Sequence, residues 1–127
     1  MAINFKVVQR GQPGVAGGGE KKFYASPVLD GEMSLNEMTT AIEKICTVSG
    51  ADIRAVLYAL VDVSVDNLAN GTIIRLGELG SLRPSLSSEG KATEAEINAT
   101  SVKYASVLFT PGTRIKAMLA AAKFKKV

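Results

Sequence analysis

Apolar residues recur at three- and four-residue steps in two neighbouring stretches of the first half of the chain. The first stretch begins at Ser34, and its recurring positions are Leu35, Met38, Ile42, Ile45 and Cys46. This spacing predicts an amphipathic helix of about three to four turns, with Cys46 in the core. Ser34 and Glu37 have the spacing of a capping box, which satisfies two amide donors at a helix start.

The second stretch predicts a helix over residues 50–70, with Ser49 as its cap and Asn70-Gly71 at its end. Its main apolar face consists of Ile53, Val56, Leu57, Leu60, Ser64 and Leu68. Val61, Val63 and Val65 extend the apolar surface around the cylinder, so one short partner helix cannot cover it. In so small a chain the simplest further cover is a second copy of the molecule, and we expect an obligate homodimer.

Near the N-terminus, residues 3–10 and 21–28 are short runs rich in β-branched and aromatic residues, and they predict a β-hairpin. The connection between them, GQPGVAGGGE, contains five glycines and Pro13 and is expected to be mobile. It lacks the Lys-Ser/Thr pair and the following helix of a phosphate-binding loop. We therefore expect residues 1–33 to form a hairpin extension with a glycine-rich loop.

Three more strands are predicted after the second helix: Thr72–Leu76, Leu79–Ser85 and residues 102–109. The first two meet at a pair of glycines. Residues 87–101 are small and polar, which indicates a loop or a projecting arm.

A terminal helix is predicted next, with Thr110 as its cap and Pro111 at its first position. Its inward positions are Ile115, Met118, Leu119 and Ala122, and Lys123 to Lys126 give it a cationic end. Strands and helices are grouped along the chain and do not strictly alternate. This order favours an α+β fold with an antiparallel sheet.

The chain has a formal net charge of +3, which is unevenly distributed. No acidic residue follows Glu96, whereas the basic residues after it are Lys103, Arg114, Lys116, Lys123, Lys125 and Lys126. Such a segment can face phosphates. Its charge is equally consistent with a solvated helix face and a basic tail.

The chain has no histidine and one cysteine. It therefore cannot form an internal disulfide, a His/Cys zinc site, or a Ser-His or Cys-His catalytic pair. Glu94 and Glu96 lie in a polar segment with nothing to perturb them. We expect no enzyme activity, metal, cofactor or small-molecule substrate. The N-terminus has no signal-peptide pattern and no run approaches the ~20 apolar residues of a membrane span, so a cytoplasmic protein without membrane contact is expected.

From Ser34 onward the chain resembles the bacterial histone-like HU and integration host factor family. The first match is the helix pair broken at TVSGAD, and the second is NGTIIRLGELGSL, a helix end, strand and glycine turn. The third is VLFTPGTRIKAML, similar to the family's closing strand and helix. The N-terminal hairpin and FTPG look most like the longer HU-related DNA-binding proteins of Bacteroides-type bacteria.

The resemblance implies that residues 34–127 form an HU-like DNA-binding domain with an arm at about residues 87–101, and that two chains intertwine in a dimer. The arm departs from the family pattern, because it lacks the Arg-Asn-Pro tip that wedges between base steps. It carries Glu89, Glu94 and Glu96 against Lys91 alone. Acids there repel phosphates, so the alternatives for the arm are a shortened or refolded element or a protein contact.

The resemblance further implies a nucleoid-associated function in which basic residues of the sheet and helix ends contact DNA backbone largely without sequence specificity. The candidate contacts are Arg75, Arg83, Lys91, Lys103, Arg114, Lys116 and Lys123, together with Gly80, whose missing Cβ permits a bend and a close approach of DNA. For Gly77 and Gly80, a plain hairpin turn explains the glycines equally well. The alternative function is a structural or protein-interaction module of the same fold that has lost DNA bending or DNA binding.

Overall fold

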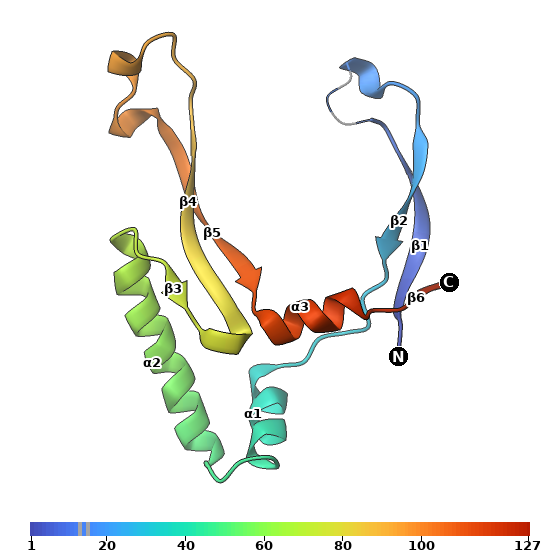
Figure 1. Cartoon of the computed structure of the whole chain (residues 1–127), viewed down its shortest axis with the longest axis vertical. Helices are drawn as coiled ribbons and strands as arrows, with labels where there is room; N and C mark the ends of the chain where they lie inside the picture. The colour runs from blue at the N-terminus through green and yellow to red at the C-terminus, as the bar shows by residue number, and fades with distance from the viewer. Residues whose placement is uncertain (13, 15) are drawn as a thin grey trace. The chain divides into compact units, whose positions relative to one another are not determined.

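The computed structural model describes residues 1–12, 14 and 16–127 and divides into two compact units. The terminal unit comprises residues 1–33 and 118–127, and the central unit comprises residues 34–117. Each unit contains one three-stranded sheet (Figure 1). The fold is mixed α+β, as the sequence predicts.

Two helices open the central unit: α1 (Leu35–Glu43) and α2 (Gly50–Ala69). The Ser34 side-chain oxygen accepts a hydrogen bond from the Glu37 amide at 3.2 Å. Ser49 accepts one in the same way from the Asp52 amide at 3.3 Å. Both predicted caps are confirmed, because each satisfies an amide donor that the first helical turn leaves unpaired.

α1 is shorter than the sequence pattern indicates, and the prediction that Cys46 lies in the core is wrong for a single chain. The helix ends at Glu43, and Cys46 lies beyond it and is exposed. The amides of Ile45 and Cys46 both donate to the Ile42 carbonyl, at 3.0 and 3.1 Å. After this tightened turn the backbone becomes extended at Ser49 in order to cap α2. The apolar spacing thus continues for one turn past the helix.

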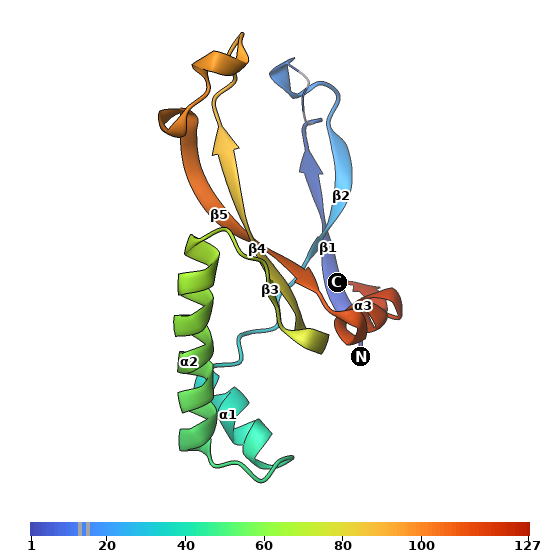
Figure 2. The ribbon, with the colours of Figure 1, turned by 60° about the vertical axis from the view of Figure 1, so that its left-hand side comes forward.

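The central sheet is antiparallel in the order β3-β4-β5, with β3 (Ile74–Arg75), β4 (Gly80–Ser88) and β5 (Val102–Pro111). α2 lies beside β3 and β4 (Figures 1 and 2). β3 pairs with Ser81 and Leu82 of β4. Pro84 lies two residues beyond that pairing, where its missing amide proton breaks no bond to β3.

The terminal helix starts later than predicted. Pro111 is the last residue of β5 and pairs with Gly80, so Thr110 and Pro111 do not open the helix. α3 (Thr113–Ala120) begins after Gly112, whose carbonyl accepts the first helical hydrogen bond. Proline is favoured at the first position of a helix. Here the pairing of β5 with β4 keeps Pro111 in the strand. Ala122, predicted to face inward from this helix, lies after its end.

The terminal unit is built on a sheet in the order β2-β1-β6. β1 (Ile3–Arg10) pairs antiparallel with β2 (Lys22–Pro27) and parallel with β6 (Phe124–Lys126). A short 3-10 turn, Ala16–Gly18, lies in the connection between β1 and β2, and Pro13 of this connection lies outside the described residues. The prediction of a cationic helix end at residues 123–126 is therefore wrong, because this segment contains the strand β6.

The pairing of β6 also changes the division of the chain. The Ile3 amide donates to the Lys123 carbonyl at 2.8 Å, and the Val127 amide donates to the Phe5 carbonyl at 3.0 Å. These bonds group residues 118–127 with residues 1–33, whereas the sequence places them in the domain that starts at residue 34. The boundary between the units falls within α3.

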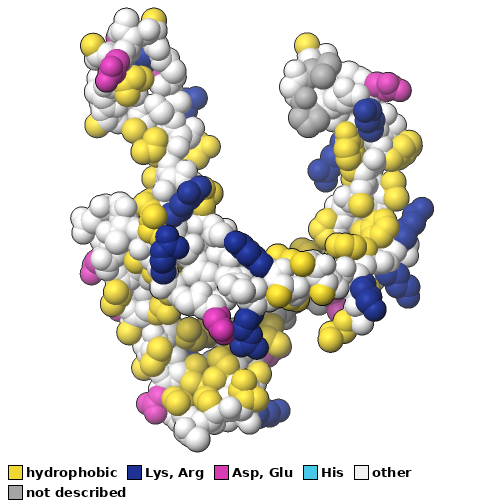
Figure 3. Space-filling view, viewed as in Figure 1, with side chains coloured by type: hydrophobic (Ala, Val, Ile, Leu, Met, Phe, Trp, Pro, Cys, Tyr) yellow, Lys and Arg dark blue, Asp and Glu magenta, His cyan; other side chains and the backbone are white. Residues whose placement is uncertain are grey.

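Neither unit closes a hydrophobic core within one chain. Among the described residues, Ile53 is the one hydrophobic side chain that is buried. Val56, Val61, Val63 and Val65 on α2 are each more than half exposed. The chain exposes 10331 Å² in total, whereas a compact monomer of its mass would expose about 6,500 Å², and two separate compact bodies about 8,000 Å². Figure 3 shows hydrophobic side chains gathered on the surface over α1 and α2.

Candidate nucleic-acid interface

The register of the central sheet separates its side chains into two chemically different faces, because paired residues of neighbouring strands lie on the same face. The central polar face consists of Arg75, Ser81, Arg83, Ser85, Ser87, Tyr104, Ser106, Leu108 and Thr110. The opposite face consists of Ile74, Leu82, Pro84, Leu86, Ala105, Val107 and Phe109. Two guanidinium groups and a row of hydroxyls supply the donors that phosphate oxygens accept.

A shallow groove of about 260 Å³ brings two of the predicted cations together. It is lined by Arg75, Gly77, Gly80, Ser81, Thr110, Pro111, Gly112 and Lys116. Arg75 comes from β3 and Lys116 from α3, and both side chains are exposed. Gly77, Gly80 and Gly112 contribute only backbone to the lining of the groove. The groove therefore offers a positively charged, hydroxyl-containing hollow of the kind that accommodates a phosphate group.

The structure assigns Gly80 a packing role. It is buried with a φ of +139°, and an added Cβ would collide with the Thr110 carbonyl and lie 2.8 Å from the Phe109 ring. Gly112 is equally restricted by the Glu78 carbonyl, and its amide donates to the Leu79 carbonyl at 3.1 Å. The start of β4 thus packs directly against the turn between β5 and α3. This packing explains the absent Cβ without DNA. At Gly77, a Cβ would meet open space, and only the φ of +62° favours glycine.

Two predicted contacts already have acidic partners. Arg114 donates to the Glu78 carboxylate at 3.3 Å, and Lys91 forms an ion pair with Glu89 at 3.4 Å. Both pairs are solvent-exposed, with the Arg114 side chain 79% accessible. Exposed pairs of this kind contribute only about 0–1 kcal/mol, so neither holds its cation strongly against a phosphate.

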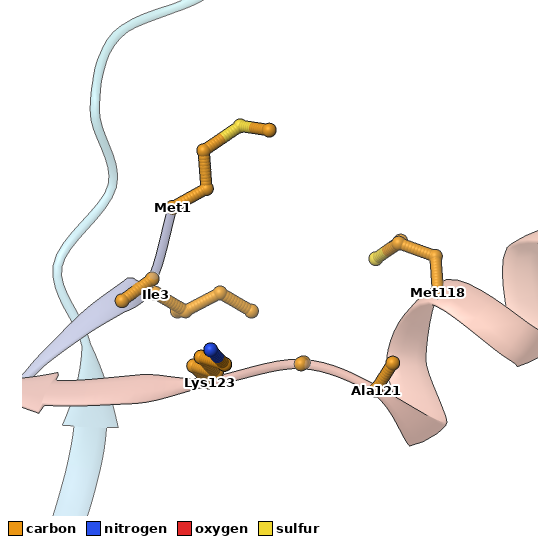
Figure 4. A pocket seen from close by; sticks show the side chains of 7 residues that line it. Met1, Ile3, Met118, Ala121 and Lys123 are labelled. Carbon is orange, nitrogen blue, oxygen red and sulfur yellow. The ribbon is translucent and has the colours of Figure 1, made fainter.

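Neither Lys103 nor Lys123 lines the groove. The pairing of β4 with β5 shifts register between Ser87 and Ser88, and Lys103 is the residue left without a partner at that bulge. Lys123 belongs to the terminal unit. There it borders a pocket of about 420 Å³ that Met1, Ile3, Met118 and Ala121 also line (Figure 4).

The arm between β4 and β5 is organised by its own hydrogen bonds. It contains two short 3-10 turns, Glu94–Glu96 and Ala99–Ser101. Asn98 caps the second turn through the Thr100 amide at 2.9 Å, and Ser101 is buried. The acids Glu89, Glu94 and Glu96 are exposed, so this tip repels phosphates and does not resemble a cationic wedge.

The sequence reasoning missed the hydroxyls of the central polar face, above all Ser81, Ser85, Ser106 and Thr110. Their alternation with apolar residues in SLRPSLSS and ASVLFT was the available signal. Serine and threonine are common in exposed strands, however, and only the register shows that they line up with Arg75 and Arg83.

These features define an HU-like α+β domain: a capped helix pair, an antiparallel sheet with an arm, and a following helix. A family model described as "HU domain fused to wHTH, Ig, or Glycine-rich motif" matches residues 1–126, and the chain belongs to this family. The HU-like family predicted from the sequence is thereby confirmed.

The structure is similar to the crystal structure of a candidate bacterial DNA-binding protein from Bacteroides vulgatus ATCC 8482, with a TM-score of 0.62 and 14% sequence identity. The match covers 100% of this chain and 49% of that one, so this chain spans about half the length of that protein. At this identity the likeness shows the fold alone. A search of curated proteins found no match. No helix in the described part of the chain is long and apolar enough to cross a membrane.

Proposed function

We propose that the chain is a homodimeric, nucleoid-associated DNA-binding protein that contacts the DNA backbone largely without sequence specificity. The observation that carries this proposal is the central polar face, on which Arg75 and Arg83 share one side of the sheet with a row of hydroxyls. Lys116 adds a third cation at the groove beside Arg75. Backbone contacts of this type position a protein on DNA without reading bases.

The exposed apolar surface of α2 supports the proposed homodimer. On a helix with about 100° between successive residues, the half-buried and buried side chains centre on Ile53 and Ser64. Val56 and Val63 flank one side of this stripe, and Val61 and Val65 flank the other. A monomer that left all four in water would lose the burial that stabilises a small domain, and a second copy with the same surface supplies it.

Salt dependence tests the DNA-binding proposal. If the central polar face and its groove neutralise about six phosphates per dimer, they should contribute about −5 to the slope of the logarithm of the association constant against the logarithm of salt concentration. Replacing Arg75 and Arg83 by glutamine should make this slope less steep by about one unit per lost contact and weaken binding to all sequences about equally. Fluorescence anisotropy with labelled duplex DNA between 50 and 200 mM salt, about the range over which such slopes are measured, gives both quantities.

A matched control is Lys44→Gln with Lys126→Gln, which removes the same formal charge from two exposed residues outside the central polar face. The control should keep the wild-type slope. DNA binding that does not change with salt contradicts the proposed mechanism.

The second candidate function is a protein-interaction module of the same fold. It is favoured by the charge of the central unit, which has eight Lys/Arg against nine Asp/Glu and therefore a net charge of −1. The acidic arm adds to this argument. Under this alternative the wild-type chain remains dimeric but shows no measurable affinity for duplex DNA at low salt.

A further inference from the structure

The terminal sheet also has two faces of different chemistry. Its register places Ile3, Phe5, Val7, Phe23 and Phe124 on one face. On the other face, which we call the terminal basic face, the cations are Lys6, Arg10, Lys22 and Lys125, with Tyr24 among them. All five of these side chains are exposed, and Figure 3 shows Lys and Arg side chains over β1 and β2.

The cations on this face lie close to one another without acids to neutralise them. Arg10 pairs directly with Lys22 across β1 and β2, an arrangement of like charges that by itself disfavours the pairing of the strands. Lys125 pairs with Asn4, next to the position of Lys6 on the same face. Neither ion pair of the described residues involves any of these cations. A face built only for solubility usually mixes both signs of charge, so this one indicates an anionic partner.

The distribution of charge between the units supports the same conclusion. The terminal unit has seven Lys/Arg against three Asp/Glu, a net charge of +4, whereas the central unit has a net charge of −1. The three acids, Glu20, Asp30 and Glu32, all lie outside the strands. The net positive charge of this chain, which gives a long-range attraction for a polyanion, therefore resides in the terminal unit.

We propose that the terminal basic face is a second DNA-binding surface, which contacts the sugar-phosphate backbone through Lys6, Arg10, Lys22 and Lys125. Neighbouring strands are about 4.8 Å apart and alternate residues about 6.8 Å, so the cations, from the level of Asn4 to that of Arg10, span an area roughly 20 Å long. Duplex DNA presents about twelve phosphate charges over that length. The Tyr24 hydroxyl adds a hydrogen-bond donor of the type that phosphate oxygens accept.

DNA fits this face better than an anionic membrane does. An amphipathic element binds an anionic membrane by burying its apolar face in the lipid while the cations of its other face meet the headgroups. Here Lys126 lies beside Phe5 and Phe124 on the apolar face, so insertion of that face would carry a charge into the lipid. The inference rests on the proposed function in taking DNA as the anion, but it concerns residues of the other unit.

The experiment compares the full-length wild-type chain with Lys6→Gln/Lys22→Gln and with Arg75→Gln/Arg83→Gln, using labelled duplex DNA over a range of salt concentrations. The terminal variant should lose about 10- to 100-fold in affinity near 0.1 M salt, and its log–log salt slope should become less steep by about two per protomer. The charge-conserving variant Lys6→Arg/Lys22→Arg should keep wild-type affinity. Neither variant should unfold at a lower temperature than the wild-type chain, because Lys22→Gln relieves the repulsion of Arg10 and Lys22→Arg keeps the charge.

β6 provides a minimal pair of variants, because its neighbouring lysines lie on opposite faces. Lys125→Gln should make the slope less steep by about one per protomer, and Lys126→Gln should leave it unchanged. If only the Arg75→Gln/Arg83→Gln variant loses affinity, the inference is overturned and the proposed function stands. If the wild-type chain binds phosphatidylserine vesicles or another protein but not DNA, both the inference and the proposed function fail. Loss of affinity in the terminal variant with retention in Arg75→Gln/Arg83→Gln supports the inference and removes the central polar face from the proposed function.

Discussion

Replacing Val61 by aspartate is expected to abolish the dimer and, with it, the cooperative folding of the chain. Val61 is 54% exposed in a single chain and lies beside the stripe of α2 that centres on Ile53. If a second copy covers this side chain, the substitution buries an unpaired carboxylate, which typically costs about 3–5 kcal/mol. A loss of that size weakens association by about 100- to 4,000-fold.

Sedimentation equilibrium and circular dichroism across a range of protein concentrations measure this effect. The wild-type unfolding midpoint should rise with protomer concentration, because an obligate dimer couples folding to association. Ala55→Asp is the matched control, since it places the same charge on the exposed side of α2 that already carries Asp62 and Asp66. A folded wild-type monomer at micromolar concentration, or a Val61→Asp variant that stays dimeric, contradicts the expected interface.

Helix positions could be predicted from the sequence because their signals are local. Ser34 and Ser49 cap helices within three residues of the amides they satisfy, and apolar residues recur along α2 from Ile53 to Leu68. The same local signals are misleading where pairing between distant segments competes with them. Pro111 looks like a helix start, but its register with Gly80 keeps it in β5. The basic residues 123–126 have the pattern of a helix end. Residues 124–126 instead form β6, which pairs in parallel with β1 near the N-terminus.

The candidate site could be predicted only in part, for a related reason. Residue types and spacing identify Arg75, Arg83 and Lys116 as basic, but they do not show which of them share a face. That grouping depends on the register of β4 with its two neighbours and on the turn between β5 and α3. The bulge that separates Lys103 from this register leaves no signature in the sequence.

Substituting Gly80 by alanine is expected to destabilise the central unit by about 3 kcal/mol or more. The φ of +139° and ψ of −157° belong to a region that glycine alone adopts readily, and forcing another residue into such a region costs about 1–3 kcal/mol. The collision of the new Cβ with the Thr110 carbonyl adds to this, because that carbonyl belongs to paired backbone and cannot rotate away as a side chain does. Urea unfolding at a fixed protomer concentration measures the loss.

Gly77→Ala separates backbone strain from collision, because Gly77 also has a positive φ but would place its Cβ in open space. This variant should lose only about 1–2 kcal/mol, the cost of a left-handed residue without a clash. Gly80→Ala should also weaken DNA binding, because relief of the collision moves Thr110 and Gly112, and both line the groove that holds Arg75 near Lys116. Equal losses of unfolding free energy for the two variants would show that glycine is needed at position 80 only for its backbone conformation. In that case the contact between β4 and the β5–α3 turn would not be what fixes the groove.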